Sequence, residues 1–125
     1  MALPPCHVMS QFYVTQSGKL NCAMFQRSCD FGLGIPFNIA SYSLLTCLIA
    51  KVCGLQRGTF THMMGDTHIY KNHIDVIKQQ INLTPYPFPS LEISDDLKEI
   101  TDAKAEDIIL KNYKSHSKLE MKMAV

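Results

Sequence analysis

The spacing of apolar residues changes once along this chain, at the glycine-rich segment FGLGIP, and this change restricts the possible folds most strongly. Before it, apolar and polar residues alternate from His7 to Thr15 and again from Leu20 to Ser28, with the two-residue period of half-buried strands. The residues QSGK between them predict the turn of a hairpin. Gly54 marks the end of a predicted helix over 36–52. Its apolar positions recur at helical spacing and are Ile39, Leu44, Leu45, Leu48, Ile49 and Val52.

The rest of the chain adds short elements of both kinds. TFTHMMGDTHIY has strand character, and Gly65 within it suggests a β-bulge. NHIDVIKQQI predicts a short helix that the prolines of TPYPFPS end. LEIS and EDIILKNY predict two brief strands, with a helix as the alternative for the DIIL core of the second. This order indicates one α+β domain over residues 1–125, with a mostly antiparallel or mixed sheet.

The bulk composition is that of a folded chain without a polyanionic partner. Of the 125 residues, 46% are hydrophobic and 18% are charged, and the formal net charge is +1. The 12 basic residues form no cluster, so duplex nucleic acid and anionic membranes are poor candidate partners. The apolar run SLLTCLIAKVCGL is too short and too interrupted to predict a membrane span.

The cysteine pattern favours a reducing compartment. The chain has 5 cysteines, an odd number with no C-x-x-C pair, which argues against a disulfide framework. No secretory signal precedes them. The expected location is the cytoplasm, with the nucleus and the mitochondrion as alternatives.

Cys6 stands between two prolines and a predicted strand, in the stretch LPPCHVMSQFYV. Pro4 and Pro5 lack a backbone N–H and stiffen the approach, so the strand can present the cysteine side chain to a cleft. The alternative is a buried small hydrophobe, because free cysteine is among the most buried residue types. Both interpretations are open on this stretch alone.

Two polar stretches could bind a phosphate and a base. In QRSCD, the Arg27 fork and the Ser28 hydroxyl suit a phosphate, whereas a surface salt bridge between Arg27 and Asp30 is the alternative. In PFNIASYS, Asn38 offers both a donor and an acceptor to a base edge, and its alternative is a helix N-cap.

A third stretch, GDTHIYKNH, carries hydroxyl-binding side chains. His68 and Tyr70 lie two residues apart, on the same face of a strand, and both can hydrogen-bond a hydroxyl. A metal site made of His62, His68 and His73 does not fit zinc spacings, so no metal is predicted. A nucleophile, a phosphate fork, a base-reading amide and a hydroxyl-binding pair together suggest chemistry on a nucleotide.

Long motifs across the chain closely resemble the C-terminal half of thymidylate synthase. They are LPPCH, QFYV, QRSCDFGLGIPFNIASYSLLT, GDTHIYKNHID, PYPFP and the terminal MAV, and the resemblance covers essentially all 125 residues. It implies an α/β/α layered fold with a mixed sheet, and a homodimer formed by sheet-to-sheet packing. It further implies reductive methylation of dUMP to dTMP, with methylenetetrahydrofolate as the cosubstrate and no metal.

The resemblance also implies roles for single residues. Cys6 matches the nucleophile that adds to carbon 6 of uracil and thereby activates carbon 5. Arg27 can help to favour its thiolate, and His7 is expected to join the hydrogen-bond network of the site. Asn38 matches the amide that reads the uracil edge, and Asp30 the carboxylate that binds the folate pterin. The further dUMP ligands are Arg27, Ser28, Cys29 and Asp30 near the phosphate, and His68, Ile69 and Tyr70 near the deoxyribose. Ala124 and Val125 match the tail that closes over the folate.

The resemblance leaves out the N-terminal half of the family, with its proton-transferring glutamate and further phosphate-binding arginines. The chain by itself is therefore expected to be an incomplete enzyme. One alternative is a nucleotide hydroxymethylase of the same fold, although Asn38 argues against a version specific for cytosine. The other is a non-catalytic nucleotide- or RNA-binding fragment, which the near-neutral charge weakens.

Overall fold

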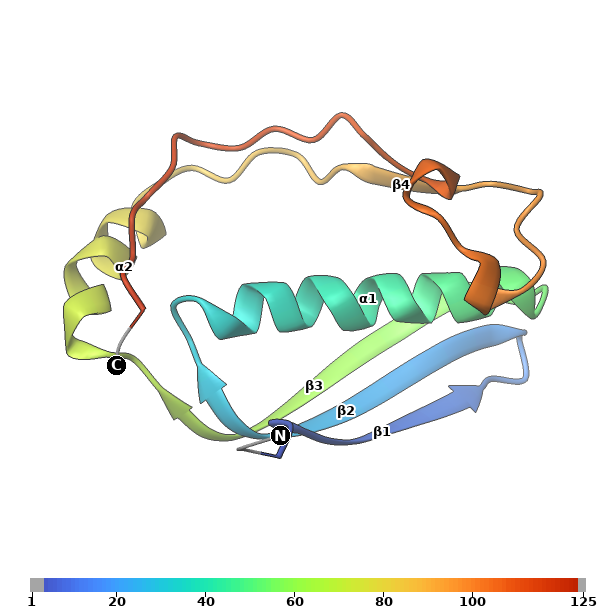
Figure 1. Ribbon diagram of the computed structural model, residues 1–125, viewed down its shortest axis with the longest axis horizontal. Helices are drawn as coiled ribbons and strands as arrows, with labels where there is room; N and C mark the ends of the chain where they lie inside the picture. The colour runs from blue at the N-terminus through green and yellow to red at the C-terminus, as the bar shows by residue number, and fades with distance from the viewer. Residues whose placement is uncertain (1–3, 124–125) are drawn as a thin grey trace.

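The computed structural model describes residues 4–123 and confirms the hairpin and the long helix (Figure 1). Strand β1 (His7–Val14) pairs antiparallel with β2 (Lys19–Asp30), and helix α1 (Gly34–Val52) follows. The helix ends at Val52, and Gly54, two residues later, has a φ of 65° in the left-handed region. Glycine adopts this conformation without steric cost, which explains why the helix stops just before it.

Strand β3 (Gln56–His68) returns from α1 and pairs parallel with β2, so the sheet has the order β1-β2-β3. One strand pair is antiparallel and the other parallel, which confirms the mixed sheet. The parallel pairing places the C-terminal ends of β2 and β3 side by side. Asp30 is thereby brought opposite His68.

The bulge predicted at Gly65 is wrong. The register between β2 and β3 runs unbroken through Gln26↔Met64 and Ser28↔Asp66, and shifts only earlier, between Leu20 and Cys22. Gly65 is instead a site of close approach, because a Cβ there would lie 3.0 Å from the Arg27 carbonyl oxygen. A glycine within a strand signals either a bulge or a close approach, and the sequence does not distinguish them.

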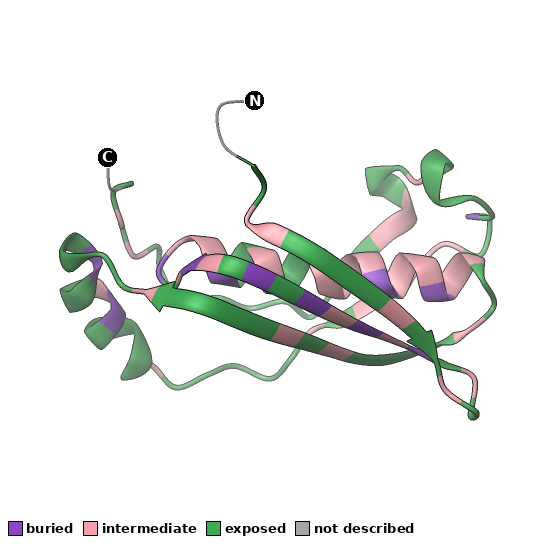
Figure 2. Ribbon diagram, turned by 90° about the horizontal axis from the view of Figure 1, so that it is seen from below, coloured by how far each residue is buried: buried purple, intermediate pink, exposed green. Residues whose placement is uncertain are grey.

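The core lies between the sheet and α1. Alternate residues of β2 are buried beneath the helix, namely Leu20, Cys22, Met24 and Gln26. Ile35, Thr46 and Ala50 are the buried residues of α1. Figure 2 shows the opposite face of the sheet as largely exposed. Its exposed large apolar side chains are Met9, Tyr13, Phe25 and Met63.

The remaining chain forms an arch on the side of α1 that faces away from the sheet (Figure 1). It begins with a short 3-10 turn, η1 (Lys71–His73), and helix α2 (Ile74–Ile81). The predicted brief strands are confirmed as β4 (Ser90–Ile93) and β5 (Ile108–Lys111), which pair antiparallel. The turns η2 (Ile100–Asp102) and η3 (Ala105–Asp107) lie between them. The last described residues return to α2.

Helix α1 is longer than the apolar run SLLTCLIAKVCGL, which by itself is too short for a membrane span. It has 19 residues and a mean hydropathy of 1.4, which by length and composition alone would suffice to cross a membrane. In the structure it lies along the sheet, and its Asn38 side chain makes polar contacts with two strands. One face of α1 thus packs against the sheet, although only Ile35, Thr46 and Ala50 are fully buried.

Candidate functional site

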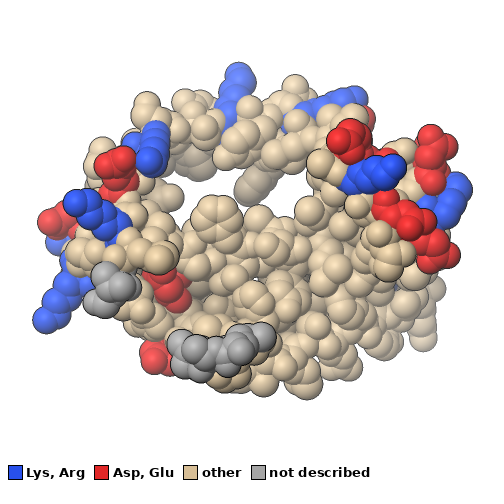
Figure 3. All heavy atoms as spheres, in the orientation of Figure 1, with Lys and Arg blue, Asp and Glu red and all other residues tan. Residues whose placement is uncertain are grey.

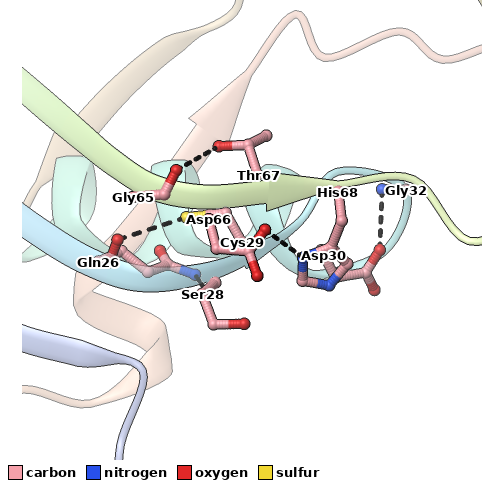
Figure 4. A network of polar contacts seen from close by, with 9 residues as sticks. All are labelled: Gln26, Ser28, Cys29, Asp30, Gly32, Gly65, Asp66, Thr67 and His68. Carbon is pink, nitrogen blue, oxygen red and sulfur yellow. Dashed lines mark hydrogen bonds and ion pairs between the residues drawn. The ribbon is translucent and has the colours of Figure 1, made fainter.

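The C-terminal end of β2 gathers most of the predicted site residues. The parallel ladder pairs Ser28 with Asp66 and Asp30 with His68. Figure 4 shows this end of the two strands, with Asp30 next to the loop that leads into α1. Residues predicted from two separate stretches of sequence, QRSCD and GDTHIYKNH, are therefore neighbours here.

Cys6 is held beside Arg27 by the backbone of both residues. The Arg27 backbone N–H donates to the Cys6 carbonyl oxygen at 3.0 Å. The Arg27 guanidinium donates to the carbonyl oxygens of Pro4 at 2.9 Å and Pro5 at 3.4 Å. The Cys6 side chain is half-buried and unpaired, so it is not the sealed core residue of the alternative interpretation.

The predicted salt bridge between Arg27 and Asp30 is not among the ion pairs of residues 4–123. The Arg27 guanidinium is instead bonded to the carbonyl oxygens of Pro4 and Pro5, the two residues that precede Cys6.

Asn38 lies one turn inside α1, so its interpretation as an N-cap is wrong. The helix begins at Gly34, and its N-cap residue is Leu33, which makes no side-chain cap. The Asn38 amide is therefore free to contact the sheet. Its Oδ1 accepts from Gln26 Nε2 at 3.0 Å, and its Nδ2 lies 2.9 Å from His7 Nε2.

Gln26 and His62 extend this hydrogen-bond chain, and neither was predicted from the sequence as a site residue. Gln26 Oε1 lies 2.9 Å from His62 Nε2, and Gln26 Nε2 also donates to the Ser28 carbonyl oxygen at 2.9 Å. Gln26 is 3% exposed. A polar residue on the buried stripe of β2, in phase with Leu20, Cys22 and Met24, was the available signal.

Burial shifts the pKa of Cys22 and that of His62 in opposite directions. Burial raises the pKa of the Cys22 thiol, so Cys22 stays a neutral core residue. Burial, and after it the charge of His7, lowers the pKa of His62. His62 is therefore neutral at pH 7 and carries a single ring N–H.

His68 and Tyr70 are neighbours, but the prediction that both lie on one face of a strand is wrong, because β3 ends at His68 and Tyr70 precedes the η1 turn. Their rings meet edge to face with centroids 5.2 Å apart, and His68 Nδ1 lies 3.7 Å from Asp66 Oδ1. Tyr70 meets His73 in the same manner at 5.7 Å. Ile69 between them is exposed, so its side chain does not line this aromatic group.

The remaining residues of the QRSCD stretch differ in exposure. Ser28 is half-buried, whereas Cys29 is fully buried and its Sγ lies 3.6 Å from the Gln26 carbonyl oxygen (Figure 4). Cys29 therefore exposes neither its side chain nor its backbone to a ligand in this structure. Asp30 Oδ1 accepts from the Gly32 backbone N–H at 3.1 Å and lies 4.0 Å from His73 Nδ1.

The C-terminal tail is tied to this end of the sheet through His73. His73 is fully buried, and its Nε2 lies 2.7 Å from the Lys122 carbonyl oxygen, to which Asn72 also donates at 3.0 Å. The loop between β2 and α1 lies close to His73, since a Cβ on Gly32 would lie 2.8 Å from His73 Nδ1. Ala124 and Val125, the predicted folate-closing residues, lie outside the described residues.

Residues 4–123 show neither a metal cluster nor a cavity of about 600 Å³ lined by predicted site residues. Residues 4–123 contain no group of three or more His, Cys, Asp or Glu side chains able to hold a metal ion. A cavity of about 600 Å³ lies between the end of α1, the start of β3 and β4. None of the predicted site residues lines it. Figure 3 shows charged side chains mostly on the arch and at the two ends of the molecule.

Comparison with known proteins agrees with the resemblance seen in the sequence. A family model described as thymidylate synthase matches residues 1–125. The chain is 62% identical to a bifunctional dihydrofolate reductase-thymidylate synthase of Paramecium tetraurelia, of which it covers 27%. It is 58% identical to a thymidylate synthase of Saimiriine herpesvirus 2 and 53% identical to one of Saccharomyces cerevisiae, covering 42% and 44% of them. The chain thus spans less than half the length of these curated relatives, although each match covers all of the chain.

Proposed function

Because the chain belongs to the thymidylate synthase family over its whole length, we propose that it carries the nucleophile and the nucleotide site of an enzyme that methylates dUMP to dTMP. The observation that carries this proposal is the joining of Cys6 to Arg27. This backbone bond places a half-buried free thiol at the same end of the sheet as Arg27, and a cysteine nucleophile there would act as its thiolate.

The residues near Cys6 suit its addition to a uracil ring. The thiolate lone pair forms a bond to carbon 6, and the electrons of the ring double bond move through carbon 5 to the oxygen on carbon 4. Asn38 has one N–H and one lone pair beyond its bonds to His7 and Gln26. An N–H donated to the oxygen would stabilise the charge that develops there.

The other polar residues fit the remaining parts of the nucleotide. Arg27 and Ser28 would bind the phosphate through charge-assisted and hydroxyl hydrogen bonds. His68 and Tyr70 would hold the deoxyribose 3′ hydroxyl, which the edge-to-face packing of their rings favours. Because β2 pairs with β3, both sets of ligands are carried by one rigid sheet end.

Asp30 fits a reduced folate. One carboxylate oxygen accepts from the Gly32 backbone N–H, which leaves the other oxygen for the N–H donors of a pterin ring. We propose methylenetetrahydrofolate as the cosubstrate, which would supply the one-carbon unit and the hydride. Asp30 would orient its ring, and the tail that Lys122 belongs to would limit the access of water.

The test of this function uses a full-length enzyme. In it, this chain replaces the matching 42% of the Saimiriine herpesvirus 2 relative; we refer to this protein as the chimera. We expect the chimera to release tritium from dUMP labelled at carbon 5 only when methylenetetrahydrofolate is present. A folded chimera that binds dUMP but releases no tritium, beside an active parent relative, would contradict the proposed function.

The exposed sheet face is proposed to pack against a second copy of the chain. Met9 and Tyr13 on β1, Phe25 on β2 and Met63 on β3 expose 38–60% of their surface on this face. An apolar face of this kind in a folded protein marks an interface. The resemblance to a family of homodimers supports a second copy as the occupant.

Phe25→Glu is expected to shift the chimera from dimer to monomer, because it would bury two unpaired carboxylates in the interface. Sedimentation velocity measures the change. Gln79→Glu, which adds the same charge on the exposed face of α2, is the matched control and should leave the dimer intact. A dimeric Phe25→Glu protein would show that this face is not the interface.

His73→Phe is expected to weaken the contact between the η1 turn and the C-terminal tail. The substitution keeps an aromatic ring in the buried site but removes the donor to the Lys122 carbonyl oxygen. We expect the KM for methylenetetrahydrofolate to rise by roughly 5- to 10-fold, in the range of one lost hydrogen bond, with little change in the KM for dUMP. Equal increases in both KM values would indicate a general loss of structure instead.

We also propose a reducing compartment, the cytoplasm foremost. All five cysteines are free in the structure, including the fully buried Cys22 and Cys29. A thiol nucleophile needs such a compartment, because oxidation removes its reactivity.

A further inference from the structure

A closed ring of contacts joins the proposed base-reading amide to a histidine on β3 that the resemblance assigns no role. Its polar half runs through three hydrogen bonds of 2.9, 3.0 and 2.9 Å. Its aromatic half consists of one edge-to-face, one stacked and one tilted pair of rings, with centroids 5.2, 6.0 and 5.7 Å apart. In order, the ring contains His7, Asn38, Gln26, His62, Phe60 and Tyr42. It connects α1 to all three strands of the sheet.

The direction of the polar half is set by a backbone carbonyl. The Ser28 carbonyl oxygen is only an acceptor, so the atom of Gln26 that faces it at 2.9 Å must be the amide nitrogen. The second hydrogen of that nitrogen then points to the Asn38 oxygen. Asn38 consequently presents its nitrogen to His7, which must accept at Nε2 and carry its proton on Nδ1.

The same logic assigns the opposite tautomer to His62. With both Gln26 amide hydrogens used, Gln26 Oε1 needs a donor, and His62 Nε2 lies 2.9 Å from it. The Nδ1 atom of His62 is buried and has no hydrogen-bond partner among residues 4–123. A proton on His62 Nδ1 would leave that buried donor without a partner, and the lone pair of Nε2 would then face a lone pair of Gln26 Oε1. The proton therefore belongs on Nε2.

We propose that His62 is a positioning residue for the pyrimidine site, because its Nε2–H holds the Gln26 amide, and through it the Asn38 amide, in the direction that accepts uracil. This inference rests on the proposed function. His62 touches neither Asn38 nor the expected base position directly, and acts through Gln26. Phe60 packs against its ring and helps to keep it in place.

The direction of Asn38 decides which base edge fits. Uracil presents an acceptor on carbon 4 and a donor at N3, which match the free N–H and lone pair of Asn38 in this direction. Cytosine presents the reverse pattern and would need the amide turned over. If the Asn38 amide were turned over, its nitrogen would face the Gln26 amide nitrogen, and two donors would oppose each other. The Gln26 amide cannot turn in response, because the Ser28 carbonyl oxygen and His62 hold it in place.

The tautomers can be observed directly in the chimera labelled with ¹⁵N-histidine. We expect the ring nitrogen shifts at pH 7.5 to show His62 protonated on Nε2 and His7 protonated on Nδ1, with His62→Gln and His7→Gln used for assignment. A His62 ring protonated on Nδ1 would overturn the proposal, whatever the enzyme activity.

The functional test compares two replacements of His62. His62→Phe keeps an aromatic ring but removes the donor, whereas His62→Gln keeps an N–H that can reach Gln26 Oε1. We expect His62→Phe to narrow the ratio of kcat/KM for dUMP over dCMP by about 10-fold, the effect of leaving one buried amide oxygen without a donor. His62→Gln should restore most of this ratio.

A purely structural role for His62 predicts a different outcome. Phe60→Leu disturbs the aromatic half of the ring while leaving the Gln26 bond to His62 in place, so it should lower the melting temperature but keep the ratio. If His62→Phe also lowers the melting temperature and keeps the ratio, His62 is not a positioning residue. An inactive chimera with the native His62 contradicts the proposed function instead, while the tautomer measurement still tests the inference.

Discussion

Cys6→Ser is expected to lower dTMP formation by the chimera about 10³-fold or more, as the loss of a covalent nucleophile does in other enzymes. A serine hydroxyl remains protonated at neutral pH and is a far weaker nucleophile than a thiolate. The contacts of Arg27 with the backbone of Pro4, Pro5 and Cys6 do not involve the thiol. The variant should therefore fold normally and still bind dUMP.

Tritium release from labelled dUMP measures this loss, and equilibrium binding of dUMP shows that the site is intact. Cys47→Ser and Cys53→Ser are the matched controls, since Cys47 is half-buried in α1 and Cys53 is exposed at its end. Both controls should keep near-normal turnover per folded molecule. A Cys6→Ser enzyme with comparable turnover would remove Cys6 from the nucleophile's role.

Asn38→Asp is expected to reverse the preference between dUMP and dCMP. A carboxylate has no N–H to donate to the uracil oxygen, and its own oxygen would face that oxygen across the site. An unpaired polar contact of this kind should reduce kcat/KM for dUMP by about 10- to 100-fold. The amino group of cytosine, in contrast, can donate to a carboxylate.

The structure shows how the surrounding residues would accommodate this change. Gln26 Nε2 can still donate to a carboxylate oxygen, and a protonated His7 could donate to the other one. Measuring kcat/KM on both nucleotides decides the matter, with Asn82→Asp at the exposed end of α2 as the control for added charge. An unchanged ratio would show that Asn38 does not read the base.

Local sequence patterns predicted most of the elements of this fold. The alternation around the QSGK turn predicted the β1–β2 hairpin, and the helical spacing before Gly54 predicted α1, which begins two residues earlier than expected. The brief strands β4 and β5 were also predicted. These elements are encoded in the order of neighbouring residues, because side-chain period and turn chemistry act over a few residues.

The partners of the site residues depended on tertiary structure. The sequence placed Asn38 near a helix start and Arg27 near Asp30, which suggested a cap and an ion pair. Packing instead set Asn38 between His7 and Gln26 and placed Arg27 on the carbonyls of Pro4 and Pro5. A hydrogen bond between distant segments depends on strand register and on how the helix lies on the sheet, neither of which local spacing encodes.

The same reason explains why Gln26 and His62 were not assigned to the site. Gln26 stands at the start of the QRSCD stretch and His62 within TFTHMM, and neither stretch indicates that the two side chains would be partners. In contrast, the residues that match the family's long motifs could be identified from the sequence by itself. Only the parallel pairing of β2 with β3 brought His62 to Gln26, and only the fixed direction of the Ser28 carbonyl determined which way the amides point.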